Sequence, residues 1–226
     1  MFRRLRELFG SEDLLQAAFA TTLTMLEMDL RMFEASSAAL RRSDSAELPF
    51  DVRQEDRRIN KYEREVRRNV LTHLSVAGTQ NIVPGLVLVS IVIDVERIGD
   101  YTKNIAELAQ LHPGRLEGGP YEGEVAEIES QVNRIFPLVL RVLREQEAEL
   151  ARNIMAREDR TGKMAEAIVQ SLISEKGRGL PVAEAVSLAL YARYLKRINA
   201  HLTNIASAVG NPFPRLGFRA KPDQGD

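Results

Sequence analysis

The second half of this 226-residue chain repeats the first, and this repeat limits the fold more than any other feature. Residues 97–106 and 197–206 both read Arg-Ile and then, after five residues, Asn-Ile-Ala. Residues 54–57, Gln-Glu-Asp-Arg, return at 157–160 as Arg-Glu-Asp-Arg. Self-similarity of this kind is typical of one structural unit copied in tandem. The sequence therefore predicts two copies of one unit rather than a single irregular bundle.

Each copy contains three stretches with apolar residues at helical spacing, so the predicted fold class is all-α, with two tandem three-helix bundles. Residues 1–112 form the first predicted repeat and residues 124–209 the second. Residues 113–123, rich in Gly and Pro, are the predicted linker, and residues 210–226 an irregular tail. Pro137 is expected to kink or end the fourth helix. The predicted helices cover about residues 11–42, 52–77, 81–112, 124–144, 148–174 and 182–209.

Composition narrows the function classes. The net charge of −1 gives no broad attraction for DNA or RNA, so nucleic acid is not an expected partner. The lack of cysteine removes disulfides and thiol chemistry and is compatible with a cytoplasmic location. The most apolar run, residues 82–93, is too short for a transmembrane helix, and the basic N-terminus has no features of a secretion signal.

Two acidic stripes form the strongest candidate site. On the third predicted helix, carboxylate and amide side chains follow each other at i, i+4 and i+8, and the second helix has a similar stripe at i, i+4 and i+7. If these helices form an antiparallel hairpin, Asp56 and Asp100 lie at one height, and carboxylates held this close repel unless a proton or cation intervenes. The candidate metal ligands are Asp56, Asn60, Glu63, Glu96, Asp100 and Asn104.

Oxygen-only ligands suit Mg²⁺, Mn²⁺ or Ca²⁺, and iron or Zn²⁺ also falls within the expected range of metal ions. The alternative is a solvated acidic face paired with neighbouring basic residues, of which Lys103 borders the stripe directly. In the second copy the matched positions are Asp159, Lys163, Lys196 and Ala200. Because two lysines would repel a cation, a metal site is expected in the first repeat only, and these lysines are expected to pair with Asp159 or Glu166.

The run from Asp94 to Tyr101, followed by Asn104-Ile105-Ala106-Glu107, resembles the signature of the PhoU family. The resemblance implies a tandem repeat of three-helix bundles and a non-enzymatic regulator that acts between a phosphate ABC transporter and a sensor histidine kinase. It also implies metal binding, which some members achieve through paired E(D)-x-x-x-D motifs. The matching positions are Asp56 with Asn60 and Glu96 with Asp100, where Asn60 departs from the acid in the motif.

Other functions remain open at this point. A ferritin-like di-iron protein needs Glu-x-x-His pairs, and the chain has none. Phosphotransfer would require a helical histidine, for which His73 is the one candidate. An accessory module of another transporter, or a carboxylate-bundle metal-binding protein, is the alternative function. A homodimer is expected, with the first and fourth helices as candidate dimer or partner faces, and Phe2, Leu5, Leu8 and Phe9 as candidate docking residues.

Overall fold

The computed structural model of the chain describes residues 14–77, 81–174 and 179–218, apart from the side chains of residues 77 and 157–159. Within these residues the chain is helical and has no strand, which confirms the all-α prediction. The N-terminal residues Phe2, Leu5, Leu8 and Phe9 lie outside the described part. The long helices are α2 (Leu14–Arg41), α3 (Val52–Ala77), α4 (Ile82–Leu111), α5 (Glu122–Glu145), α6 (Ala148–Ser174) and α7 (Val182–Gly210).

Helix boundaries agree with the sequence expectation to within a few residues. Helix α4 begins directly after Asn81, the predicted start signal. Helix α5 begins at Glu122, inside the predicted linker, which also contains the short 3-10 helix η2 (Gly119–Tyr121). The predicted irregular tail contains a second 3-10 helix, η4 (Phe213–Arg215). The connections between the repeats and after α7 are therefore more ordered than their Gly and Pro content indicates.

Helix α5 continues through Pro137 as one element, so the expected end of the helix at this proline is not found. Proline lacks the backbone N–H that would bond to the preceding turn, which normally breaks a helix interior. Here Phe136 and Val139, on either side of the proline, are completely buried. Their burial in the core offsets the missing hydrogen bond, and the helix continues.

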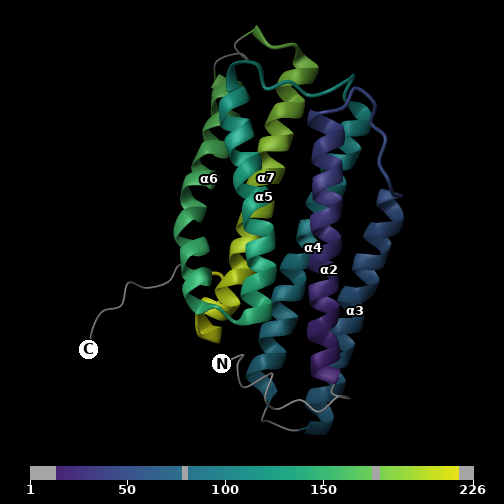
Figure 1. The fold of residues 1–226 in the computed structure, drawn as a ribbon, viewed down its shortest axis with the longest axis vertical. Coiled ribbons are helices and arrows are strands. Elements are labelled where there is room, and N and C mark those ends of the chain that lie inside the picture. The colour runs from purple at the N-terminus through teal and green to yellow at the C-terminus, as the bar shows by residue number, and fades with distance from the viewer. Residues whose placement is uncertain (1–13, 78–80, 175–178, 219–226) are drawn as a thin grey trace, which may run out of the picture.

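The three helices of each repeat pack on one another, and the two repeats join along two seams (Figure 1). Helix α4 packs on α7, and α2 packs on α5. At the second seam the rings of Phe33 and Phe136 stack with centroids 5.6 Å apart. At the first, Tyr101 stacks on His201 at 5.8 Å. Each pair occupies equivalent positions of the two repeats, as expected where an approximate two-fold axis relates them.

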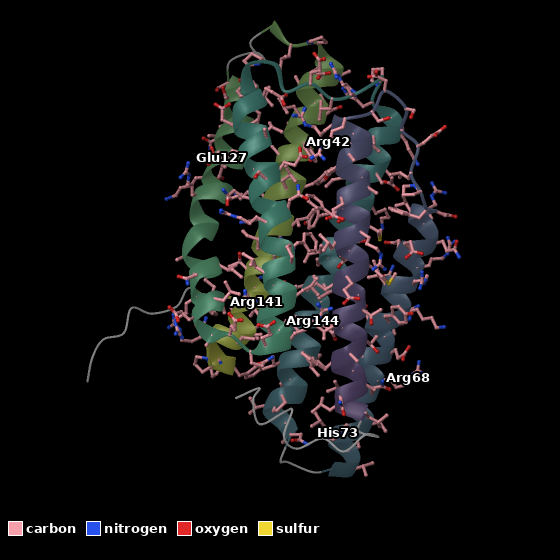
Figure 2. The ribbon with its side chains drawn as sticks, in the orientation of Figure 1. Arg42, Arg68, His73, Glu127, Arg141 and Arg144 are labelled. Carbon is pink, nitrogen blue, oxygen red and sulfur yellow. The ribbon has the colours of Figure 1, made fainter. Side chains whose placement is uncertain are left out.

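The α2–α5 seam changes one expectation. These helices are the first and fourth of the sequence, which were predicted as faces for a dimer or another partner. The structure buries part of both faces against each other within one chain. Ion pairs also lie along this seam: Arg42 pairs with Glu129, and Arg144 pairs with Glu27. Figure 2 labels the two arginines.

Among the described residues, none of the helices combines the length and the apolar composition that a membrane span requires. The buried side chains are mainly Leu, Ile, Val and Ala, as the low aromatic content predicts. They form one continuous core that extends through both repeats.

Candidate functional site

The acidic stripes of α3 and α4 face each other across the hairpin, as predicted. The ammonium Nζ of Lys103 donates to Oδ1 of Asp56 at 2.9 Å and to Oδ1 of Asp100 at 3.0 Å. Asn60 donates from Nδ2 to the other Asp56 oxygen at 3.4 Å. Because one ammonium contacts both aspartates, the structure places Asp56 and Asp100 at the same height on neighbouring helices. We call Asp56, Asn60, Glu96, Asp100 and Lys103 the acidic cluster.

The remaining predicted ligands are less closely joined. Glu63 is paired with Arg67 on its own helix at 2.7 Å, one turn away. Glu96 lies 3.6 Å from Arg97, whose guanidinium also contacts Asp100 at 3.3 Å. Asn104 is half-buried, and no hydrogen bond joins its side chain to the cluster within the described residues. Glu96 thus joins the acidic cluster through Arg97, whereas Glu63 and Asn104 lie outside it.

Electrostatics in the cluster reflect crowding of negative charge. The pKa of Glu96 is raised by partial burial first and then by Asp100, with smaller effects from Glu63 and Asp56. Burial alone would lower the pKa of Lys103, but the hydrogen bonds to Asp56 and Asp100 outweigh it and raise that pKa. Lys103 is therefore a firmly charged ammonium between two carboxylates.

A buried carboxyl group behind the cluster was not predicted. Asp29 of α2 is 0% exposed, and neither of its oxygens has a hydrogen-bond partner within the described residues. Burial first, and then the charges of Glu96 and Asp100, raise the pKa of Asp29 well above its usual range. A Cβ atom added at Gly99 would lie 2.9 Å from Oδ1 of Asp29, so glycine at this position lets the carboxyl group approach α4. The sequence signal was an aspartate among the apolar core positions of α2.

The second repeat has changed the same positions. At the offsets of 103 and 100 that align the repeats, Val132 replaces Asp29 and Asn199 replaces Gly99. Asn199 is 1% exposed, and its amide has no hydrogen-bond partner within the described residues. Each repeat therefore buries one polar side chain at these paired positions, but only the first buries a group that can carry charge.

One lysine position of the second repeat, Lys196, behaves as the non-metal interpretation predicts. Lys196 lies 3.3 Å from Glu166, which confirms the expected ion pair. Ala200 contributes no ligand atom, and the side chain of Asp159 lies outside the described part of the structure.

The acidic cluster fits one ammonium group better than a divalent metal ion. One oxygen of Asp56 and one of Asp100 accept from Lys103, and the amide of Asn60 points a donor at Asp56. Hard divalent ions require about six oxygen ligands at 2.0–2.6 Å. No group of three or more Asp, Glu or His side chains in the described residues is arranged to hold a metal ion. A metal ion at these positions stays a prediction.

A polar cavity between α2 and α5 was also missed. It has a volume of about 590 Å³, and Arg41, Arg42, Glu122 and Glu129 line it. Nη2 of Arg42 donates to Glu129 at 2.8 Å, and Nε of Arg41 lies 3.6 Å from the same carboxylate. Burial by itself would raise the pKa of Glu122, but the hydrogen bond from Arg41 and the backbone N–H of Gly118 lower it. Glu34 also lines the cavity, so three glutamates face two arginines and the cavity has no preference for anions.

His73 is a packed residue in this structure. It is 8% exposed, and Nε2 of its ring accepts a hydrogen bond from the amide Nδ2 of Asn81 at 2.9 Å, near the connection between α3 and α4 (Figure 2). A phosphoacceptor histidine must be reached by a donor domain, and this burial does not favour such a role.

The described residues form an all-α protein that consists of two copies of a three-helix unit, without a membrane-spanning helix. The acidic cluster lies in the first copy. These features define the class as a tandem-bundle protein. The PhoU domain matches residues 22–109 and again residues 125–209. These matches cover most of the chain and fall within the two repeats, and the chain therefore belongs to the PhoU family.

Solved structures show the same fold. PhoU from Pseudomonas aeruginosa superposes with a TM-score of 0.73 at 24% identity, covering 87% of this chain and 95% of that one. The phosphate transport system regulatory protein PhoU from Streptococcus pneumoniae superposes with a TM-score of 0.68 at 18% identity, covering 87% and 91%. No curated protein matches the sequence.

Proposed function

We propose that this chain is a non-enzymatic, cytoplasmic regulator of phosphate uptake and of phosphate-responsive signalling. It acts as a homodimer through direct contact with components of a phosphate ABC transporter and with a sensor histidine kinase. The observation that carries this proposal is the repeated match to the PhoU domain over residues 22–109 and 125–209.

Two further observations support the proposal. One structural relative, from Streptococcus pneumoniae, is itself described as a phosphate transport system regulatory protein. Within the described residues, the ion-paired side chains of the two repeats are held by neighbours of their own repeat or of the seam between repeats, an arrangement suited to a rigid adaptor. The predicted metal ion is no part of this proposal.

The test is capture of the partner from living cells at two phosphate levels. A photo-crosslinking residue is placed at Val76, which is 84% exposed, or at Val182, which is 80% exposed. These positions lie on the end of α3 and the start of α7, near opposite ends of the bundle (Figure 1). Neither substitution disturbs the core, and each serves as the control for the other.

We expect crosslinks to a phosphate transporter component or a sensor kinase, with a yield that changes between phosphate-replete and phosphate-starved cells. Loss of the gene should raise phosphate uptake in replete cells, and the unlabelled chain should restore it. Crosslinks to unrelated proteins only, together with unchanged uptake in the deletion strain, would contradict the proposal. Light scattering of the purified chain measures the dimer independently.

A further inference from the structure

The acidic cluster of the first repeat holds a cation that belongs to the chain itself. Nζ of Lys103 lies within 3.0 Å of an oxygen from Asp56 on α3 and from Asp100 on α4. Two carboxylates on neighbouring helices need a positive charge between them to remain ionised together. We propose that Lys103 is the resident cation of this cluster, which takes the place of a divalent metal ion and excludes such an ion from the intact protein.

The neighbouring side chains are arranged for this ammonium. The side-chain Nδ2 of Asn60 donates to Asp56, so the side-chain oxygen of Asn60 is not the atom that faces this carboxylate as a further ligand. The second oxygen of Asp100 faces the guanidinium of Arg97 at 3.3 Å. The N···O separations around Lys103, 2.9 and 3.0 Å, are those of charge-assisted hydrogen bonds. A divalent ion needs shorter distances of 2.0–2.6 Å and more oxygens than these.

Without Lys103, the same residues would present an excess of oxygen ligands. Asp56, Glu96 and Asp100 would then be balanced mainly by Arg97, whose side chain is 54% exposed. Behind them lies Asp29, fully buried against Gly99 with neither oxygen hydrogen-bonded within the described residues. This unpartnered carboxyl group is an independent sign that the site has more acceptors than donors. Removal of one lysine should therefore turn the cluster into a divalent-cation site.

The size of the effect follows from Coulomb repulsion. A divalent ion among these carboxylates would lie a few ångströms from the ammonium of Lys103, where the repulsion is strong even at an effective dielectric constant near 20. Lys103 is 23% exposed, so solvent reduces the effect. We expect the affinity for Mn²⁺ to rise by on the order of a hundredfold when the charge is removed.

The experiment measures Mn²⁺ binding to the full chain after removal of bound metals with EDTA. Free Mn²⁺ is followed by electron paramagnetic resonance, and heats of binding by calorimetry. Lys103→Met removes the charge and keeps the chain length, whereas Lys103→Arg keeps the charge. Lys196→Met is the matched control, because Lys196 is a lysine of the second repeat that pairs with Glu166. Lys103→Met combined with Asp100→Asn removes a ligand from the newly opened site.

We expect no saturable Mn²⁺ binding in the wild type, Lys103→Arg or Lys196→Met, one site in Lys103→Met, and loss of that site in the double variant. Stoichiometric binding of Mn²⁺ by the wild type as tight as in Lys103→Met overturns the proposal. So does a folded Lys103→Met variant, verified by circular dichroism, that gains no site. If Lys103→Met does not fold, Lys103→Gln provides the same comparison with a polar side chain.

Discussion

Substitution of Gly99 by alanine measures directly how closely Asp29 approaches α4. The new Cβ atom would lie 2.9 Å from Oδ1 of Asp29 and 3.1 Å from Cδ1 of Ile59. The first distance is shorter than carbon and oxygen atoms tolerate without a shift, and overpacking of this kind costs about 1–3 kcal/mol. Alanine also favours a helix interior over glycine by about 1 kcal/mol. The net expectation is a loss of about 0–2 kcal/mol of unfolding free energy.

Gly162 of α6 is the matched control, because it also lies inside a helix and, apart from its own helix backbone and chain neighbours, no atom of the described residues lies within 4 Å of its added Cβ. Gly162→Ala should therefore stabilise the chain by about 0.5–1 kcal/mol. Urea unfolding followed by circular dichroism compares the two variants, and the difference between them isolates the crowding at Gly99. Equal stabilisation by both substitutions would refute the proposed contact. Combining Gly99→Ala with Asp29→Ala should recover most of the loss.

Three further changes test other parts of the structure by urea unfolding. Asp29→Asn removes an ionisation that burial makes unfavourable. Because the pKa of Asp29 is raised, the folded state holds this proton more tightly than the unfolded chain does. The wild type therefore loses stability as pH rises above about 4, and the unfolding free energy of the variant should increase relative to it from that pH upward. A difference that stays constant with pH would contradict this. Phe136→Ala removes one ring of the aromatic stack at the α2–α5 seam and should lower the unfolding free energy by about 3–5 kcal/mol. A loss below about 1 kcal/mol would show that the stack is not part of the core. Glu184 accepts hydrogen bonds from the His112 ring at 2.9 Å and from the backbone N–H of Glu117 at 2.6 Å. Glu184→Ala removes both and should lower the unfolding free energy by about 1–3 kcal/mol, whereas Glu184→Gln should retain part of these contacts.

Much of the fold could be predicted because the repeat and the helical spacing are local or periodic signals. The hairpin argument for Asp56 and Asp100 needed only equal distances from one turn, and the structure confirms it through Lys103. Whether the helix ends at Pro137 or continues through it could not be decided from the sequence. The local rule for proline is correct for an isolated helix, but burial of the residues around it decides the outcome.

The candidate site was predicted less completely than the fold. The sequence places Lys103 beside the acidic stripe, but only the structure shows its ammonium between the two aspartates rather than in solvent. Asp29 lies on a helix that contributes nothing to either acidic stripe, and its approach depends on how α2 packs against α4. Contacts between helices distant in sequence depend on such packing, and spacing along one helix does not reveal them.

Both repeats bury an unpartnered polar side chain at this point, Asp29 in the first and Asn199 in the second, but only the first buries a group that can carry charge, and this supports a role for the acidic cluster beyond stability. Gly99 weakens the interior of α4, and Asp29 buries a carboxyl group without a hydrogen bond within the described residues. The second repeat has the same fold and contains Val132 and Asn199 at these positions, so the fold requires neither the glycine nor the acid. Proteins keep local conflicts of this kind mainly where function demands them. The acid, the glycine and the lysine between two aspartates occur together only in the first repeat, and selection for the arrangement of charge explains this combination better than selection for packing.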